Sequence, residues 1–185
     1  MPQVNRRLVH TRSIHVDAYA RDDKLWDLVA TIQDVKQRDL KLESRVCPAG
    51  EALHEMELTV TIDVRMRIIA AQARTIAAPY MGTCDSFPEI YQKLVGLSLL
   101  QGFREAVAKR LGGNQGCTHI TELAGVLPTV AIQAFAGEIV HLEPNSEKLP
   151  LQLDRCRALR LDGPVVAQFY PRWRSVPEKV EGEEE

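Results

Sequence analysis

The sequence predicts an α+β protein in which an antiparallel sheet packs against helices. In the first half of the chain, apolar and polar residues alternate as in half-buried strands, and short polar turns separate these segments. Apolar residues at helical spacing follow in the middle of the chain. With 185 residues, 45% of them hydrophobic and 26% charged, the chain is long enough to bury one core without disulfides.

Two pairs of strands are predicted first. Leu8 to Tyr19 and Leu25 to Asp34 are rich in β-branched and aromatic residues, and the polar group between them is typical of a hairpin turn. From Glu55 to Val64 the side chains alternate, so the apolar ones share one face of a strand. The next segment, Arg67 to Ala77, is expected to return antiparallel to it.

Three helices are predicted to follow. The first begins at about Pro88, the second covers Phe103 to Leu111, and the third runs from about Cys117 through Ile132. Asp85 or Ser86 is expected to cap the first helix, because short polar side chains bond the free N–H groups at helix starts. Gly112-Gly113 is expected to end the second helix. Pro128 is expected to kink the third helix or to end it early, because proline lacks an N–H.

The C-terminal part predicts further strands and then a tail. Asp162-Gly163 lies among the apolar residues of Cys156 to Tyr170, which is typical of a hairpin turn. We therefore expect added C-terminal strands within a single domain over residues 6–173. Residues 174–185 are polar and acidic, and we expect them to form a disordered tail.

Charge and hydropathy exclude several classes of function. The net charge of −2 argues against a nucleic-acid-binding surface. The most apolar stretch, Ala124 to Val140, is interrupted by polar residues and is too short to cross a membrane. No signal peptide is recognisable, so we expect a cytoplasmic location in which the four cysteines are free thiols or ligands. The expected partner is a small molecule or another protein.

Four side chains that bind soft metals lie at predicted ends of strands and helices: His54, Cys84, Cys117 and His119. The predicted strand pairing places His54 opposite a residue near Ile76, at the same end of the sheet as Cys84. Cys117 opens a helix, where free N–H groups and the helix dipole stabilise a thiolate. Thiolate and imidazole donors together suit zinc or an iron-sulfur centre. These four residues are therefore the predicted metal ligands.

Glu122 and Asp85 are the predicted acid-base groups beside these ligands. Glu122 lies one helical turn after His119, so it could orient that histidine or act as a general base. A solvent-facing helix carboxylate is the alternative explanation.

The ligand set also has a structural alternative. Free cysteine often behaves as a small buried hydrophobe, and we expect this of Cys47. His10, His15 and His141 are expected to be structural, whereas Cys156 could complete or flank the site. Spacing alone leaves a metal site and buried thiols both open, because the chain has no dense CxxC pattern.

Several motifs carry a resemblance to a known family. They are Arg12-Ser13-Ile14, Asp22 to Asp27, Leu53 to Met56, Ala78-Pro79-Tyr80, Cys84, Leu111-Gly112-Gly113 and Gly116 to Leu123. Together they resemble a bacterial family known as a domain of unknown function, numbered 2889. The resemblance runs from about Arg6 to Trp173 and is most specific around Cys117.

A second, more distant resemblance concerns the strand from His54, its return strand and the helix that follows. This part is similar to the core of iron-sulfur cluster assembly scaffolds of the NifU and IscU type. By the resemblance, the three scaffold cysteines, which hold zinc or a nascent [2Fe-2S] cluster, fall on His54, Cys84 and Cys117. It implies a NifU/IscU-like core, to which the N-terminal hairpin and the C-terminal strands are additions.

The first functional hypothesis is a cytosolic metal-binding protein that holds zinc. It would be a zinc-dependent enzyme acting on a small molecule if one coordination position stays open, and Glu122 or Asp85 would then move protons. The alternative is an iron-sulfur cluster or sulfur carrier, or an assembly protein. A third hypothesis is a structural domain with buried thiols. The metal content of protein purified without oxygen distinguishes the three.

Overall fold

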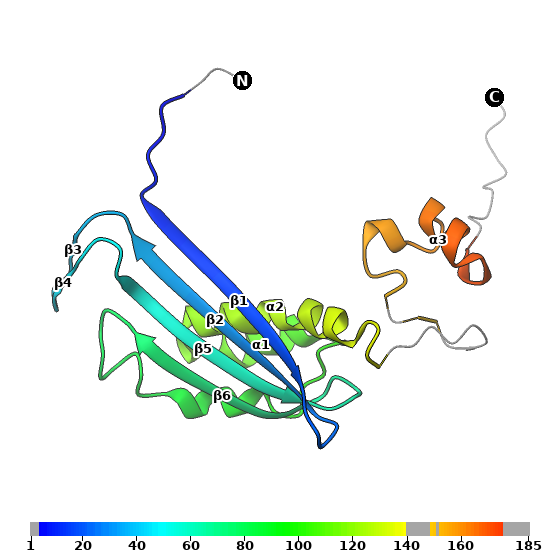
Figure 1. Ribbon diagram of the computed structural model, residues 1–185. Coiled ribbons are helices and arrows are strands. Elements are labelled where there is room, and N and C mark those ends of the chain that lie inside the picture. Colours follow the sequence, from blue (N-terminus) through cyan, green and yellow to red (C-terminus); the bar gives the residue numbers. More distant parts are fainter. Residues whose placement is uncertain (1–3, 140–148, 151, 176–185) are drawn as a thin grey trace, which may run out of the picture. The chain divides into compact units, whose positions relative to one another are not determined.

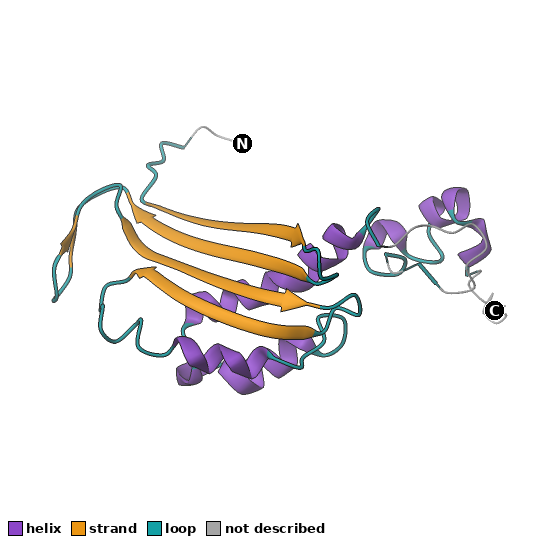
Figure 2. Ribbon diagram, turned by 60° about the horizontal axis from the view of Figure 1, so that its bottom comes forward, coloured by secondary structure: helices purple, strands orange, loops and turns teal. Residues whose placement is uncertain are grey.

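The computed structural model describes residues 4–139, 149–150 and 152–175. The chain forms two compact units, Met1–Gln133 and Ala134–Glu185. In the first unit, helices lie on one face of a four-stranded antiparallel sheet (Figure 1, Figure 2). The predicted α+β class is confirmed.

Four long strands form the sheet. They are β1 (His10–Ala20), β2 (Trp26–Lys36), β5 (Ala52–Ile62) and β6 (Ile68–Ala77). Neighbouring strands are antiparallel, and the order across the sheet is β1-β2-β5-β6. A short ribbon of β3 (Leu40–Lys41) and β4 (Val46–Cys47) lies in the connection from β2 to β5. The predicted N-terminal hairpin and the predicted antiparallel return are both present.

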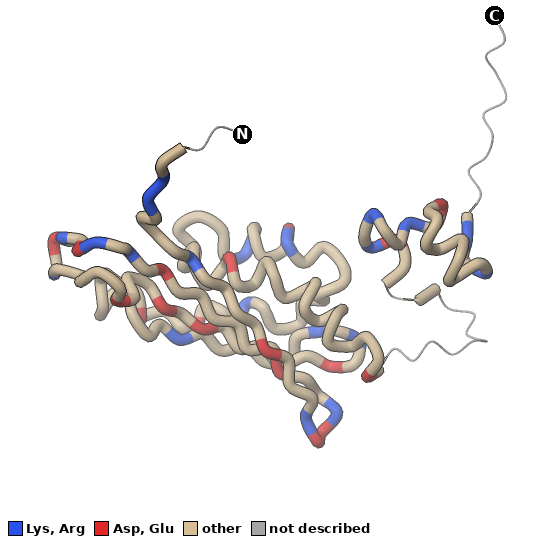
Figure 3. Tube along the Cα trace, turned by 45° about the horizontal axis from the view of Figure 1, so that its top comes forward, with Lys and Arg blue, Asp and Glu red and all other residues tan. Residues whose placement is uncertain are grey.

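The sheet buries one face, as the alternation of its residues predicts. On that face Leu28, Ile32, Leu58 and Val60 have no exposed surface. Burial of such side chains against the helices supplies most of the stability of the unit. Outside the core, Lys and Arg are interspersed with Asp and Glu along the first unit (Figure 3).

The strand register places a row of polar side chains at one end of the buried face. Asp34 pairs with Arg12 of β1 on one side and with His54 of β5 on the other. Paired residues of antiparallel strands point to the same face, so these three side chains adjoin. Asp34 continues the series of buried alternate residues that begins at Trp26, and it is only 2% exposed. The pairing then shifts at a bulge after Asp34.

Four helices follow the sheet in the described chain up to Phe135. They are η1 (Pro88–Leu94), α1 (Phe103–Leu111), η2 (Gly113–Gln115) and α2 (Thr118–Phe135), of which η1 and η2 are 3₁₀ helices. The bounds of α1 are as predicted, and α2 begins directly after Cys117. The helix does not end at Pro128. Leu127 and Ala131 on either side of the proline are fully buried, and this packing outweighs the lost hydrogen bond.

The predicted cap of the first helix is wrong. The N-cap of η1 is Phe87, and it makes no side-chain hydrogen bond. Asp85 Oδ1 instead accepts the N–H of Gly82 at 2.6 Å, and the Ser86 hydroxyl donates to the Thr83 carbonyl at 2.7 Å. Both short side chains are used within the preceding turn, which competes with helix capping.

The second unit contains helical turns where strands were predicted. They are η3 (Arg157–Leu159), α3 (Pro164–Phe169) and η4 (Pro171–Trp173), and residues 149–150 and 152–175 include no strand. Pro164 follows Gly163 at the first position of α3, where its fixed φ favours a helix over a hairpin. The prediction of C-terminal strands is therefore wrong. His141 and the predicted tail from residue 176 onward lie outside the described residues.

Candidate metal centre

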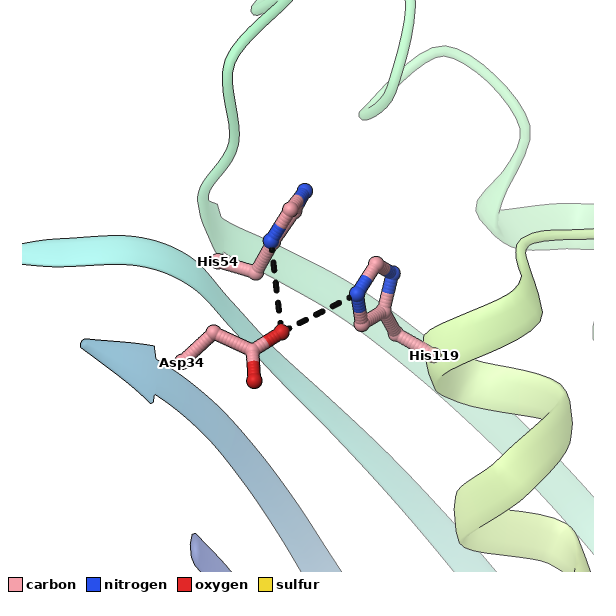
Figure 4. A group of neighbouring side chains, drawn as sticks. All are labelled: Asp34, His54 and His119. Atoms are coloured by element: carbon pink, nitrogen blue, oxygen red, sulfur yellow. Dashed lines mark ion pairs between the residues drawn. The ribbon is translucent and has the colours of Figure 1, made fainter. Parts of the chain in front are cut away.

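Side chains from three elements converge at the polar end of the sheet: Asp34 of β2, His54 of β5 and His119 of α2 (Figure 4). Asp34 Oδ2 lies 3.3 Å from His54 Nδ1 and 3.1 Å from His119 Nε2. The two imidazole rings stack with their centroids 4.0 Å apart. One ligand atom from each residue lies within 4.8 Å of the others, so this group could bind a metal ion.

The start of α2, which carries His119, is fixed by a buried tyrosine. The Tyr91 hydroxyl accepts the N–H of Cys117 at 2.8 Å and donates to the carbonyl of the same residue at 3.2 Å. The chain passes close to α1 just before this point. A Cβ at Gly116 would lie 2.9 Å from the Leu111 carbonyl oxygen, so a larger residue would displace the helix start.

Asp34 is ionised and surrounded by basic side chains. Arg12 donates from Nε to Oδ1 and from Nη2 to Oδ2, both at 2.8 Å. His10 Nε2 lies 3.2 Å from Oδ1. The hydrogen bonds from Arg12 outweigh the effect of burial and lower the pKa of Asp34 to about 2. The carboxylate is therefore charged at neutral pH.

His54 turns a ring nitrogen, Nδ1, toward this carboxylate. Burial lowers the pKa of His54 from its ordinary value, and the neighbouring His119 adds to this effect, so the neutral ring is favoured. Its Nδ1 is buried and makes no hydrogen bond within the described part of the chain, although it lies 3.3 Å from Asp34 Oδ2. Nδ1 faces Asp34, while the other ring nitrogen points away from it (Figure 4). A neutral, buried nitrogen in this position is suited to ligating a cation.

A pocket of about 500 Å³ adjoins both histidines. Its lining includes all four predicted ligands and one predicted acid-base group: His54, Cys84, Cys117, His119 and Asp85. The rest of the lining consists of Arg74, apolar side chains such as Met56 and Phe87, and hydroxyl and amide groups. Asp34 is not among the described residues that line the pocket.

Cys117 lies next to the cluster without belonging to it. Its Sγ is 3.8 Å from His119 Nδ1, the ring nitrogen that does not face Asp34. Within the described residues, neither Cys117 nor Cys84 is part of the group whose ligand atoms meet. Ligation by these two thiols stays a prediction. The structure does bring together the other two predicted ligands, His54 and His119.

A family model described as a protein of unknown function, DUF2889, matches residues 10–133. The chain belongs to this family. The matched region contains Asp34, His54 and His119, and it also contains Cys84 and Cys117 of the pocket. No curated protein and no solved structure matches the chain, and the resemblance to NifU and IscU stays a hypothesis. Among the described helices of this DUF2889 member, none is long and apolar enough to cross a membrane.

The predicted acid-base residues have other contacts. Glu122 Oε2 lies 2.7 Å from Arg12 Nη1, and Asp85 accepts the backbone N–H of Gly82 at the pocket rim. Their catalytic roles stay predictions. Of the remaining candidates, Cys47 is buried as expected and Cys156 is exposed in the second unit.

Sequence reasoning missed Asp34, although the strand pattern carries a signal for it. The residue occupies the next inward position after the alternating apolar residues that end at Ile32. A carboxylate at a position predicted to be buried needs partners there. His54 likewise occupies an inward position of the alternating pattern, two residues before the buried Met56 of β5. His10, expected to be structural, also reaches Asp34.

The low pKa of Asp34 predicts how metal-free protein responds to acid. The folded state holds this proton more weakly than the unfolded chain, whose carboxyl keeps its ordinary value. The unfolding free energy should therefore fall by about 2 kcal/mol as the pH drops from roughly 4 to 2. Because Arg12 causes the lowered pKa of Asp34, the unfolding free energy of an Arg12→Met variant should fall less over this pH interval. Urea unfolding at a series of pH values measures both, and parallel curves for the two proteins would contradict the assignment.

Proposed function

We propose that this DUF2889 member is a cytosolic metal-binding protein that holds a divalent ion, zinc in the first instance, through Asp34, His54 and His119. The donor atoms would be Asp34 Oδ2 and the two ring nitrogens nearest to it, His54 Nδ1 and His119 Nε2. Four free cysteines are in keeping with a reducing compartment.

The number of donors around Asp34 carries the proposal. An ionised carboxylate offers about four lone pairs. Arg12 uses one on each oxygen, and His10 faces Oδ1. One lone pair on Oδ2 is then left for the nitrogens of both His54 and His119. A cation between these three atoms satisfies them together, whereas hydrogen bonds leave one nitrogen unpaired.

Protonation state and spacing support the same arrangement. Metal ligands must be deprotonated, and both the low pKa of Asp34 and the lowered pKa of His54 provide this. Atoms bound to one tetrahedral zinc ion lie roughly 3.3 to 3.5 Å apart. The distances from Asp34 Oδ2 to the two histidines, 3.3 and 3.1 Å, need only a small adjustment. Two imidazoles and one carboxylate suit zinc, and they are also the ligand set of many iron(II) sites.

The adjoining pocket favours an enzyme over a purely structural site. Three protein ligands leave an open position on a zinc ion, and such an ion supplies Lewis-acid chemistry for hydrolysis or hydration. His54 and His119 also line the pocket, so the proposed ion and a molecule in the cavity would contact the same two side chains. The volume of about 500 Å³ fits a small molecule.

A zinc titration tests the proposal. Protein stripped with a chelator is titrated with Zn²⁺ against a chelating dye, and one equivalent should bind. His15→Ala is the matched control. Like the two ligand histidines, His15 lies near a carboxylate, at 3.0 Å from Asp17 Oδ1, but it is exposed on β1. This variant should bind zinc as the wild type does. Failure of the wild type to bind either Zn²⁺ or Fe²⁺ would overturn the proposal.

A second candidate function rests on the contact between Cys117 and His119. The thiol, the imidazole and Asp34 form a chain of contacts at 3.8 and 3.1 Å, and the thiol lines the pocket. A histidine held by a carboxylate can take the proton of a neighbouring thiol, which activates it as a nucleophile. This arrangement supports a sulfur carrier, the alternative expected from the sequence.

Alkylation rates test the thiol candidate. In metal-free protein at pH 7, iodoacetamide should modify Cys117 faster than the exposed Cys156 and the buried Cys47, because His119 assists its ionisation. Replacing His119 by alanine should slow the reaction of Cys117 about tenfold and leave Cys156 unchanged. Site-resolved mass spectrometry measures the rates. A rate at Cys117 that is insensitive to His119 would exclude the relay.

A further inference from the structure

Arg12 makes three polar contacts at the candidate centre. Its guanidinium spans both oxygens of Asp34 at 2.8 Å, and its third nitrogen, Nη1, lies 2.7 Å from Glu122 Oε2. It comes from β1, whereas Asp34 is on β2 and Glu122 is on α2. One side chain therefore links two strands and the helix that carries His119.

The two-point contact restricts how Asp34 can bind an ion. A guanidinium fork that lies along both carboxylate oxygens occupies one lone pair of each and fixes the plane of the group. Because His10 faces the remaining lone pair of Oδ1, Asp34 can then offer an ion one oxygen, Oδ2, and not both. Calcium accepts carboxylates through two oxygens and prefers many oxygen ligands, whereas zinc and cobalt take one oxygen beside nitrogen donors.

The third contact acts on the position of His119. Glu122 lies one helical turn after His119 on α2, so the pair of Arg12 and Glu122 ties that turn of the helix to the sheet. The carboxylates of Asp34 and Glu122 thus both accept hydrogen bonds from the guanidinium of Arg12. Because His119 is on the same turn, its distance to Asp34 depends on this link.

We infer that Arg12 is the positioning residue of the metal centre, which limits Asp34 to one-oxygen ligation and holds His119 in place through Glu122. The inference rests on the proposed metal function. By this inference, Arg12 makes the centre selective for ions that take one carboxylate oxygen beside nitrogen donors, such as Zn²⁺ and Co²⁺, over Ca²⁺.

The test compares Arg12→Gln and Glu122→Gln with Arg21→Gln. Arg21 is a matched control, because it also spans both oxygens of one carboxylate, Asp23, and reaches a second, Asp27, but at the exposed hairpin turn. Metal-free proteins are titrated with Co²⁺, and the visible absorption spectrum reports the coordination geometry as well as the affinity.

Arg12→Gln should bind Co²⁺ about 10 to 100 times more weakly than the wild type, with a changed spectrum and a smaller preference over Ca²⁺. Glu122→Gln should bind Co²⁺ about three to ten times more weakly than the wild type. Arg21→Gln should bind it as the wild type does. Wild-type affinity and spectrum in Arg12→Gln would overturn the inference while leaving the metal function intact. Should Arg12→Gln not fold, the same result in Glu122→Gln, whose side chain is 45% exposed, would overturn it. A wild type that binds neither Co²⁺ nor Zn²⁺ overturns both proposals.

Discussion

Replacing His119 by alanine is expected to lower the affinity for zinc at least 100-fold while leaving the protein folded. The substitution removes one of three ligands and leaves an incomplete site of one imidazole and one carboxylate. The fold should persist, because His119 is not part of the apolar core and Tyr91 still holds the start of α2 through Cys117. Competition with a chelating dye measures the affinity.

Two comparisons make the result for His119 specific. Cys117→Ser should keep most of the zinc affinity, because its sulfur contacts the ring nitrogen of His119 that does not face Asp34. Melting curves should show zinc raising the midpoint of the wild type and of Cys117→Ser but not of His119→Ala. The reverse pattern, with zinc binding lost in Cys117→Ser and kept in His119→Ala, would show that thiols bind the ion.

The largest loss of stability in the centre is expected from Asp34→Ala. The carboxylate is 2% exposed, and it pairs with Arg12 and adjoins His10 and His54. Removing one partner of a buried ion pair usually costs about 3 to 5 kcal/mol. Arg12 is 38% exposed and keeps Glu122, so we expect a smaller loss of about 2 kcal/mol in the free energy of unfolding.

Urea unfolding of metal-free Asp34→Ala measures this loss. The control is Asp17→Ala, because Asp17 also pairs with a histidine on the sheet but is about half exposed. Its free energy of unfolding should stay within about 0.5 kcal/mol of the wild type. Equal effects of the two substitutions would contradict the central place of Asp34 in the cluster. The Asp34 variant should also lose zinc binding.

The sheet could be predicted because its residues follow period-two patterns that only one register satisfies. Leu28 and Ile32 of β2 must share a face with Leu58 and Val60 of β5, and the short polar turns leave little freedom in pairing. The C-terminal part lacked such a constraint. Asp162-Gly163 is a turn signal in any context, and Pro164 decides that a helix follows.

The histidines of the centre were predicted from the sequence, whereas the carboxylate was missed, for a physical reason. His54 and His119 are recognisable as ligand types at the ends of elements. Asp34 is the last residue of a predicted strand, but only the register, which pairs it with His54, reveals that the two side chains adjoin. The contact between Arg12 and Glu122 joins residues 110 positions apart, which local patterns do not encode.

X-ray absorption spectroscopy of the zinc-loaded protein tests the central claim most directly, because it separates nitrogen and oxygen ligands from sulfur by distance. The Asp34, His54 and His119 set predicts a first shell at about 2.0 to 2.2 Å, with the outer scattering of two imidazole rings and no sulfur. A sulfur shell at about 2.3 Å would contradict it, because that distance would place the ion on Cys84 and Cys117 instead.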